Sequence, residues 1–107
     1  MAIDHVLPGQ CLHLGPLGSA LGDEKTTALV KTDRFEAVRL VLRAGSTIPA
    51  HAVPGYISLQ CIEGAVEVDA ISITTLRPGD WMYLDRAQKH GLNAIKDSTL
   101  LLTIYFD

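Results

Sequence analysis

Turn-forming residues recur at short intervals along this chain, and their spacing limits what can lie between them. Glycine, alone or close to proline, occurs at residues 8–9, 15–18, 45–46, 54–55, 63–64 and 78–80. Such residues end helices and strands. The segments between them show no helical period of apolar residues. Short segments separated by regular turns predict an all-β sandwich or barrel.

Alternating apolar residues mark the strands of this predicted fold. In residues 34–43, Val38, Leu40 and Leu42 share one face, which predicts that this face packs in the core. The pair Glu63 and Gly64 is expected to turn a hairpin. Residues 100–106 are almost continuously apolar, which is typical of a strand covered on both faces. The other predicted strands are residues 57–62, 65–69, 71–76, 81–84 and 91–95.

Length and composition favour one globular domain. The chain has 107 residues, of which 48% are hydrophobic and 20% charged, enough for a complete core and too apolar for disorder. Nine Lys and Arg against twelve Asp and Glu give a net charge of −3 without a basic run, which argues against nucleic acid or an anionic membrane as partner. Because no secretory signal or membrane-length apolar stretch is visible, we expect a cytoplasmic protein.

Three groups of residues receive structural interpretations: the cysteines, the N-terminal segment and the aromatic residues. Cys11 and Cys61 are too few and too far apart for a disulfide framework or a metal motif, so we expect both to be buried thiols. Residues 1–24 are expected to form an N-terminal strand or arm, with a loop of small residues at 15–23. The aromatic residues are expected mainly to fill the core; these are Tyr56, Trp81, Tyr83 and Tyr105.

Residues 45–107 carry spacings that resemble those of the cupin family. Gly45, His51 and Gly64 stand at intervals of its first motif, in which a glycine precedes a His-x-His pair, a glutamate and a second glycine. Gly79 and His90 match the glycine and histidine of the second motif. The resemblance implies a single domain over residues 1–107 with the double-stranded β-helix, or jelly-roll barrel, of small RmlC-like cupins. It also implies a homodimer.

The resemblance further implies a set of inward-facing metal ligands, which is incomplete here. Its four ligand positions correspond to His51, Val53, Ile57 and His90 in this sequence. Valine and isoleucine donate nothing, whereas a first-row divalent metal generally takes three or more protein ligands. A bulge or turn at residues 53–56 could turn Gln60 inward as a weak third ligand. The metal, if one binds, would be iron, manganese, nickel or zinc.

Three hypotheses for function follow, and whether the chain is an enzyme stays open. In the first, His51 and His90 hydrogen-bond a small organic molecule, such as a carboxylate or enol, in a barrel pocket that Val53, Ile57 and Gln60 also line. In the second, the same two histidines serve a metal-dependent enzyme of the dioxygenase or isomerase type, as the resemblance implies. In the third, the chain is a structural or regulatory homodimer, since a monomer would leave a sheet edge uncovered. Histidine also titrates near neutrality, so direct acid–base catalysis is a further alternative.

Overall fold

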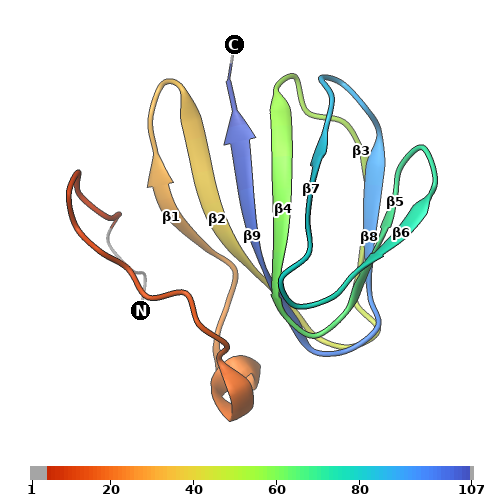
Figure 1. The fold of residues 1–107 in the computed structure, drawn as a ribbon, viewed down its shortest axis with the longest axis horizontal. Coiled ribbons are helices and arrows are strands. Elements are labelled where there is room, and N and C mark those ends of the chain that lie inside the picture. Colours follow the sequence, from red (N-terminus) through yellow and green to blue (C-terminus); the bar gives the residue numbers. More distant parts are fainter. Residues whose placement is uncertain (1–4, 107) are drawn as a thin grey trace.

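The computed structural model describes residues 5–106 and consists mainly of antiparallel β-strands (Figure 1). A short 3-10 helix, η1 (Gly18–Asp23), precedes nine strands within these residues. Helix η1 occupies most of the segment that was expected to be a loop. Across residues 5–106, no helix has the length and apolar character needed to cross a bilayer. The strands are β1 (Thr27–Lys31), β2 (Phe35–Leu42), β3 (Thr47–His51), β4 (Tyr56–Glu63), β5 (Val66–Asp69), β6 (Ile73–Leu76), β7 (Trp81–Leu84), β8 (His90–Ala94) and β9 (Ser98–Tyr105).

These strands form two sheets that enclose an apolar core. One sheet has the order β1-β2-β9-β4-β7 and the other the order β3-β8-β5-β6. Alternation along β2 places Leu40 and Leu42 in the core, as predicted, and Val38 packs against it. Val66 and Val68 of β5, in the opposite sheet, are fully buried in the same core. The predicted all-β architecture is therefore confirmed.

The turn at Glu63 and Gly64 joins the two sheets. Strand β4 pairs with β7 and β9, whereas β5 pairs with β6 and β8. The expectation of a hairpin here is therefore wrong. Gly64 has a φ of 87°, and a Cβ at this position would overlap the side chain of Ser98 and the carbonyl of Asp97. Only glycine fits this close crossing of the chain.

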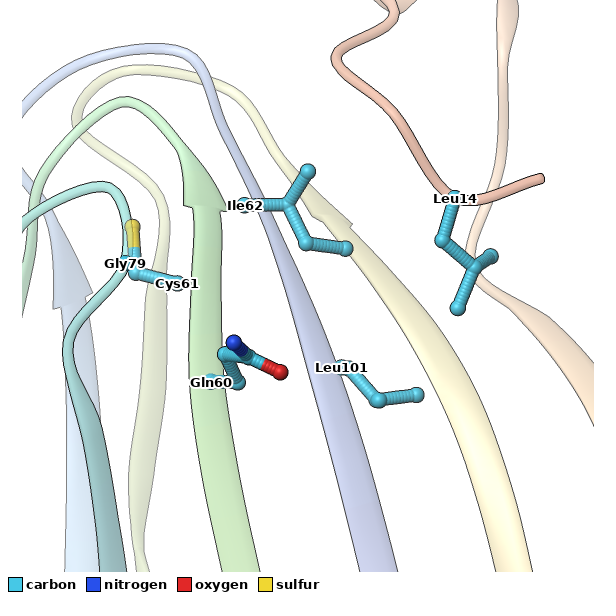
Figure 2. Close-up of a pocket in the computed structure, with 6 residues that line it drawn as sticks. All are labelled: Leu14, Gln60, Cys61, Ile62, Gly79 and Leu101. Carbon is cyan, nitrogen blue, oxygen red and sulfur yellow. The ribbon is translucent and has the colours of Figure 1, made fainter.

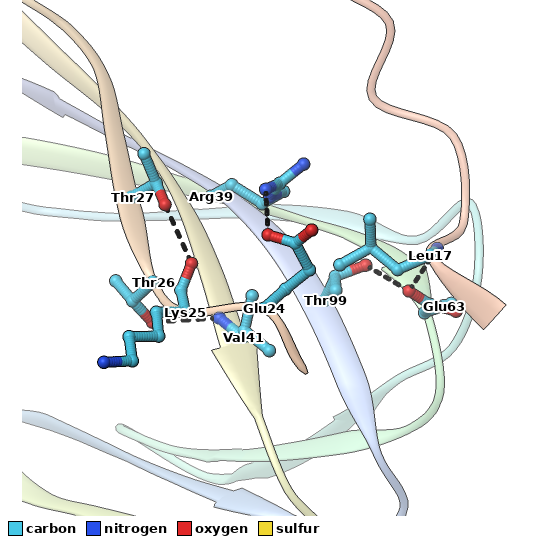
Figure 3. Close-up of polar contacts among 9 residues, drawn as sticks. All are labelled: Leu17, Glu24, Lys25, Thr26, Thr27, Arg39, Val41, Glu63 and Thr99. Atoms are coloured by element: carbon cyan, nitrogen blue, oxygen red, sulfur yellow. Dashed lines mark hydrogen bonds and ion pairs between the residues drawn. The ribbon is translucent and has the colours of Figure 1, made fainter. Parts of the chain in front are cut away.

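The Glu63 carboxylate binds an N-terminal arm, residues 5–24, to the five-stranded sheet (Figure 3). The arm is also held by the ion pair of Glu24 with Arg39 at 3.5 Å and by the hydrogen bond from Val6 N–H to the Leu29 carbonyl at 2.8 Å. Glu63 Oε1 accepts hydrogen bonds from the backbone N–H of Leu17 at 2.8 Å and from Thr99 Oγ1 at 3.0 Å. Glu63 Oε2 accepts a third from the N–H of Gly18 at 3.1 Å. Glu63 lies at the end of β4 and Thr99 in β9, so one side chain ties the arm to two central strands.

Four aromatic residues lie on the outer surface of the five-stranded sheet, so the expectation that they fill the core is wrong. The inward positions of β4 belong to Ile57, Leu59 and Cys61, which leaves Tyr56 on the opposite face. The exposed fractions are 59% for Trp81, 61% for Tyr83, 37% for Tyr56 and 47% for Tyr105.

The two cysteines differ in exposure. Cys61 is buried, as predicted, and its thiol donates a hydrogen bond to the carbonyl of Glu63 at 3.4 Å. Burial raises the pKa of the Cys61 thiol, and the negative charges of Asp80 and Glu63 raise it further. Cys11 is exposed on the arm, so its predicted burial is wrong.

Candidate functional site

A β-bulge in β3 brings together the two histidines that the sequence motifs singled out. Ile48 pairs with Leu92, and His51 pairs with His90, so residues 49–50 of β3 stand opposite one residue of β8. An extra residue reverses the alternation of side chains beyond it. His51 therefore points to the same side of the sheet as His90. The bulge precedes His51 and is not at residues 53–56, where it was anticipated.

The imidazole rings of His51 and His90 are neighbours at one end of the barrel. Their centroids are 4.5 Å apart, and the ring planes are inclined by 51°. His90 shares its inward face with Leu92 and Ala94 and is only 5% exposed, whereas His51 is exposed. Figure 1 places β3 and β8 side by side at this part of the barrel.

In each of the two rings, Nδ1 lies within hydrogen-bond distance of a backbone carbonyl. His51 Nδ1 lies 3.0 Å from the carbonyl oxygen of Pro49, and His90 Nδ1 lies 3.1 Å from that of Gln88. A carbonyl can only accept, so this geometry assigns the proton of each neutral ring to Nδ1. Each Nε2 then carries a lone pair that can accept a hydrogen bond or bind a metal.

Burial keeps His90 neutral. Loss of hydration lowers the pKa of His90 below its ordinary value of 6.5, and the neighbouring His51 lowers it further, while the hydrogen bond to Gln88 acts in the opposite direction. Near neutral pH, His90 is therefore a hydrogen-bond acceptor at Nε2 and carries no positive charge.

A cavity of about 310 Å³ lies between β6 and β7, and neither His51 nor His90 lines it. It is linked to the histidines through Gln88, whose carbonyl holds the His90 ring and whose residue lines the cavity. Leu84, another lining residue, is the cross-strand partner of Ile57. The remaining lining residues are Ala70, Ile71, Ser72, Thr74, Met82 and Tyr83.

Gln88 contributes an unused hydrogen-bond donor. Its Oε1 accepts a hydrogen bond from the backbone N–H of Asp85 at 3.3 Å, which settles which end of the amide is oxygen. Its Nε2 is buried and has no hydrogen-bond partner among the described residues. A buried amide donor without an acceptor is costly, so an acceptor on a ligand would stabilise it.

Sequence reasoning missed Gln88, although a signal was present. The residue lies two positions before His90, in the turn of the second motif. Ala87, where the family has glycine, has a positive φ of 56°, so the turn keeps the left-handed backbone that glycine favours. The sequence therefore held one indication of the site, the polar residue Gln88 next to Ala87 in this turn.

Of the other predicted pocket residues, two pack in or against the core and one lies on the outer face. Val53 follows the end of β3 and is half-buried against the core, and Ile57 is a core residue with 2% exposure. The inward orientation anticipated for Gln60 is wrong, because alternation along β4 is unbroken from Tyr56 to Cys61 and leaves Gln60 exposed on the outer face.

Gln60 instead lines a different hollow, of about 300 Å³, on the outer side of the sheet (Figure 2). Leu14 of the arm reaches toward Leu101 and Ile62 across this hollow, and the Gln60 amide lies between them and Gly79. It is therefore separate from the barrel end where the histidines meet.

The donors at the barrel end do not fit a metal held by three protein ligands. Within residues 5–106, no cluster of three or more His, Cys, Asp or Glu side chains could hold a metal ion. Val53 and Ile57 present hydrocarbon where the family has ligands, so two imidazole nitrogens remain. Sites for iron, manganese, nickel or zinc in proteins generally use three or four such groups.

The fold is that of the cupins, a jelly-roll barrel, as comparison with solved structures shows. A cupin superfamily protein from Desulfitobacterium hafniense aligns over the whole of both chains with a TM-score of 0.79 and 15% identity. An RmlC-like cupin from Desulfovibrio desulfuricans aligns over 90% of this chain and 97% of its own, with a TM-score of 0.72 and 19% identity. The predicted jelly roll and the resemblance to small cupins are confirmed at the level of the fold.

The fold also occurs within an enzyme of known reaction. A salicylate 1,2-dioxygenase from Pseudoaminobacter salicylatoxidans, in complex with gentisate, matches 69% of this chain and 21% of its own, with a TM-score of 0.66 and 23% identity. No protein-family model and no curated protein sequence matches this chain.

Proposed function

We propose that this chain binds a small organic molecule at the barrel end where His51 and His90 meet. The observation that carries the proposal is the orientation of the two rings, each held at Nδ1 by a carbonyl so that both Nε2 lone pairs are free. The cavity that Gln88 lines, of about 310 Å³, falls at the lower end of the roughly 300–1,000 Å³ typical of small-molecule sites.

The polarity of the site favours one class of ligand. A neutral imidazole that is held at Nδ1 accepts a hydrogen bond at Nε2, so the ligand should present an O–H group to His90. Gln88 Nε2 is a donor without a partner among residues 5–106, so the ligand should also carry a carbonyl oxygen. An enol or hydroxyl next to a carbonyl combines both requirements. A carboxylate would place its lone pairs against those of the histidines and should bind less well while His90 is neutral.

The test compares two ligands of similar size, one that can donate an O–H hydrogen bond and one that can only accept hydrogen bonds. We expect maltol, whose enol hydroxyl lies next to a carbonyl and is mainly un-ionised at pH 7.5, to bind at that pH, and cyclohexanecarboxylate to bind at least about tenfold more weakly. Titration calorimetry measures both affinities. His90→Ala and Gln88→Leu should each weaken binding of the enol about tenfold, the equivalent of losing one hydrogen bond of about 1.4 kcal/mol.

His13→Ala is the matched control, because it removes a histidine from the arm. Equal binding of the enol to the wild type, His90→Ala and His13→Ala would contradict the proposed site. Absence of binding by any enol or hydroxy-carbonyl compound of this size would contradict the proposed function.

A metal-dependent enzyme of the dioxygenase or isomerase type is the second candidate. The observation favouring it is that the two imidazole rings lie with their centroids 4.5 Å apart, and the fold likeness to a salicylate 1,2-dioxygenase adds support. It ranks second because the site offers two protein ligands, whereas these metals generally take three or more. Elemental analysis of protein purified without chelator tests it. Stoichiometric iron, manganese, nickel or zinc that disappears in the His51→Ala, His90→Ala double variant would reverse the ranking.

A further inference from the structure

A further pocket, which we call the arm pocket, lies between the N-terminal arm and the hairpin of β1 and β2. Figure 1 shows the arm beside β1, the edge strand of the five-stranded sheet. The arm lines the pocket with residues 5–8, and the hairpin lines it with residues 30–32 and Phe35. Its volume of about 560 Å³ is within the roughly 300–1,000 Å³ typical of small-molecule sites. Since His51 and His90 belong to the other sheet, the arm pocket is separate from the barrel end.

Both walls of the arm pocket supply apolar side chains. Val30 of β1 pairs with Ala37 of β2, and Phe35 precedes Ala37 by two residues. Side chains that stand opposite each other, or two positions apart on one strand, share a face of the sheet, so Val30 and Phe35 lie on the same face. From the arm, Val6 and Leu7 face the same pocket. Leu7 is 63% exposed, and a hydrocarbon bound in the pocket would cover part of this surface.

Hydrogen bonds close the turn in each wall. In the turn at residues 7–10, the N–H of Gln10 donates to the Leu7 carbonyl at 2.9 Å, and Gln10 Oε1 accepts from the N–H of Leu7 at 2.8 Å. In the hairpin turn, the N–H of Thr32 donates to the Phe35 carbonyl at 2.8 Å, and Thr32 Oγ1 accepts from the N–H of Phe35 at 3.1 Å. A pocket between two closed turns has little freedom to lose when a ligand binds, which favours affinity.

One backbone hydrogen bond joins the two walls. The register of β1 with β2 shifts between Ala28 and Val30, so Leu29 is the extra residue of a β-bulge. Its carbonyl accepts from the N–H of Val6 at 2.8 Å. A ligand that contacts both walls would hold them together, and it should therefore protect this N–H from exchange with solvent.

The charged groups of the arm pocket favour an anion. Lys31 and His5 are the lining residues that can carry a positive charge, and none of the lining residues within 5–106 is acidic. Glu36 stands opposite Lys31 in the register, but the ion pairs formed within residues 5–106 involve Arg39 and Arg43 and not Lys31. A lysine ammonium offers three donors and no acceptor, so its natural partner here is a carboxylate.

We propose that the arm pocket binds a small carboxylate with an apolar body, such as a medium-chain fatty acid. The hydrocarbon lies between Leu7 of the arm and Val30 and Phe35 of the hairpin, and the carboxylate contacts Lys31 and His5. The site is independent of the one proposed at the barrel end, which favours an uncharged hydroxy-carbonyl compound. The two sites therefore select ligands of different charge.

The test uses three probes with the same number of carbon atoms and different head groups, which are octanoate, 1-octanol and octylammonium. We expect titration calorimetry at pH 7.5 to show binding of octanoate, with octanol bound about fivefold more weakly because it lacks the charge. Octylammonium should bind at least about 20-fold more weakly, because its charge is repelled by Lys31. Amide hydrogen exchange should show added protection at Val6 when octanoate is present.

Two variants separate the contributions of charge and of apolar contact. Lys31→Met should remove the preference for octanoate over octanol and leave the affinity for octanol unchanged. Leu7→Asp should weaken both probes at least about tenfold, because it removes apolar contact and adds a negative charge. Lys25→Met and Leu12→Asp are the matched controls, since both side chains are exposed nearby in the chain and neither lines the arm pocket.

Circular dichroism checks that each variant is folded, and Leu7→Ser replaces Leu7→Asp if that variant is not. Failure of octanoate to bind at millimolar concentrations would overturn the proposal. Equal affinities for the three probes would overturn it too, because the head group would then make no contact of its own. If His90→Ala abolishes octanoate binding while Leu7→Asp and Lys31→Met retain it, the carboxylate binds at the barrel end and the arm pocket is not its site.

Discussion

Replacing one carboxylate oxygen of Glu63 by an amide nitrogen should measurably destabilise the fold, because this carboxylate holds the N-terminal arm. In Glu63→Gln, the remaining oxygen can still accept from Leu17 N–H and Thr99 Oγ1, which both bond to Oε1. The new amide NH₂ then replaces Oε2 and confronts the N–H of Gly18, so two donors face each other. One hydrogen bond to a charged group is lost, worth about 1.5–3 kcal/mol, and the other two lose the assistance of charge.

We therefore expect Glu63→Gln to lower the free energy of unfolding by about 2–3 kcal/mol, or the thermal midpoint by on the order of 10 °C. Urea unfolding measures the first quantity. Amide hydrogen exchange should show lost protection at Leu17 and Gly18, which connects the loss to the arm.

Glu67→Gln is the matched control, because the half-buried Glu67 accepts one hydrogen bond, from Asn93 at 3.1 Å. Its effect should stay within about 0.5 kcal/mol, as for most surface substitutions. If Glu63→Gln and Glu67→Gln have equal effects, or if Leu17 and Gly18 keep their protection, the reasoning about the anchor is refuted.

Three further predictions concern other parts of the molecule. The pKa of His90 lies below 6.5 in the fold, so the unfolded chain binds this proton more readily than the folded chain does. The contribution of neutral His90 to stability should therefore be complete above about pH 6.5 and decline below it. His90→Asn should flatten that decline when urea unfolding is measured across pH. A thiol reagent such as DTNB should label the exposed Cys11 within minutes and Cys61 only on unfolding; equal rates would contradict the assigned burial. A Cβ on Gly55 would overlap the Tyr105 carbonyl, so Gly55→Ala should cost about 1–3 kcal/mol in thermal unfolding, and a neutral result would refute this close approach.

Local patterns predicted the strands well, because alternation is a property of neighbouring residues. Leu40 and Leu42 lie in the core as their spacing required, and the last apolar segment became the central strand β9. The short strands β1 and β3 were not predicted. Their residues include Lys31 and Pro49, and their pairing with β2 and β8 depends on contacts distant in the sequence.

The site was predicted in part, for the same reason. Motif spacing singled out His51 and His90, and the structure places their rings together. The sequence analysis placed Gln60 on the wrong face, because the bulge that changes the alternation lies at residues 49–50 and leaves β4 regular from Tyr56 to Cys61. Periodicity also distinguishes the two faces of a strand without showing which one is covered. Trp81 and Tyr83 therefore had no sequence signal that marked them as exposed.

The position of β9 bears on how the chain is made. Strand β9 lies between β2 and β4, and each of the eight residues of β2 has a partner on it. Until residues 98–105 leave the ribosome, β1 and β2 have no neighbour to join them to β4 and β7. The apolar faces of these strands therefore stay uncovered during most of the synthesis of the chain. At about 5–20 residues per second, that interval lasts several seconds, during which chaperones have access to the segments that later form the core.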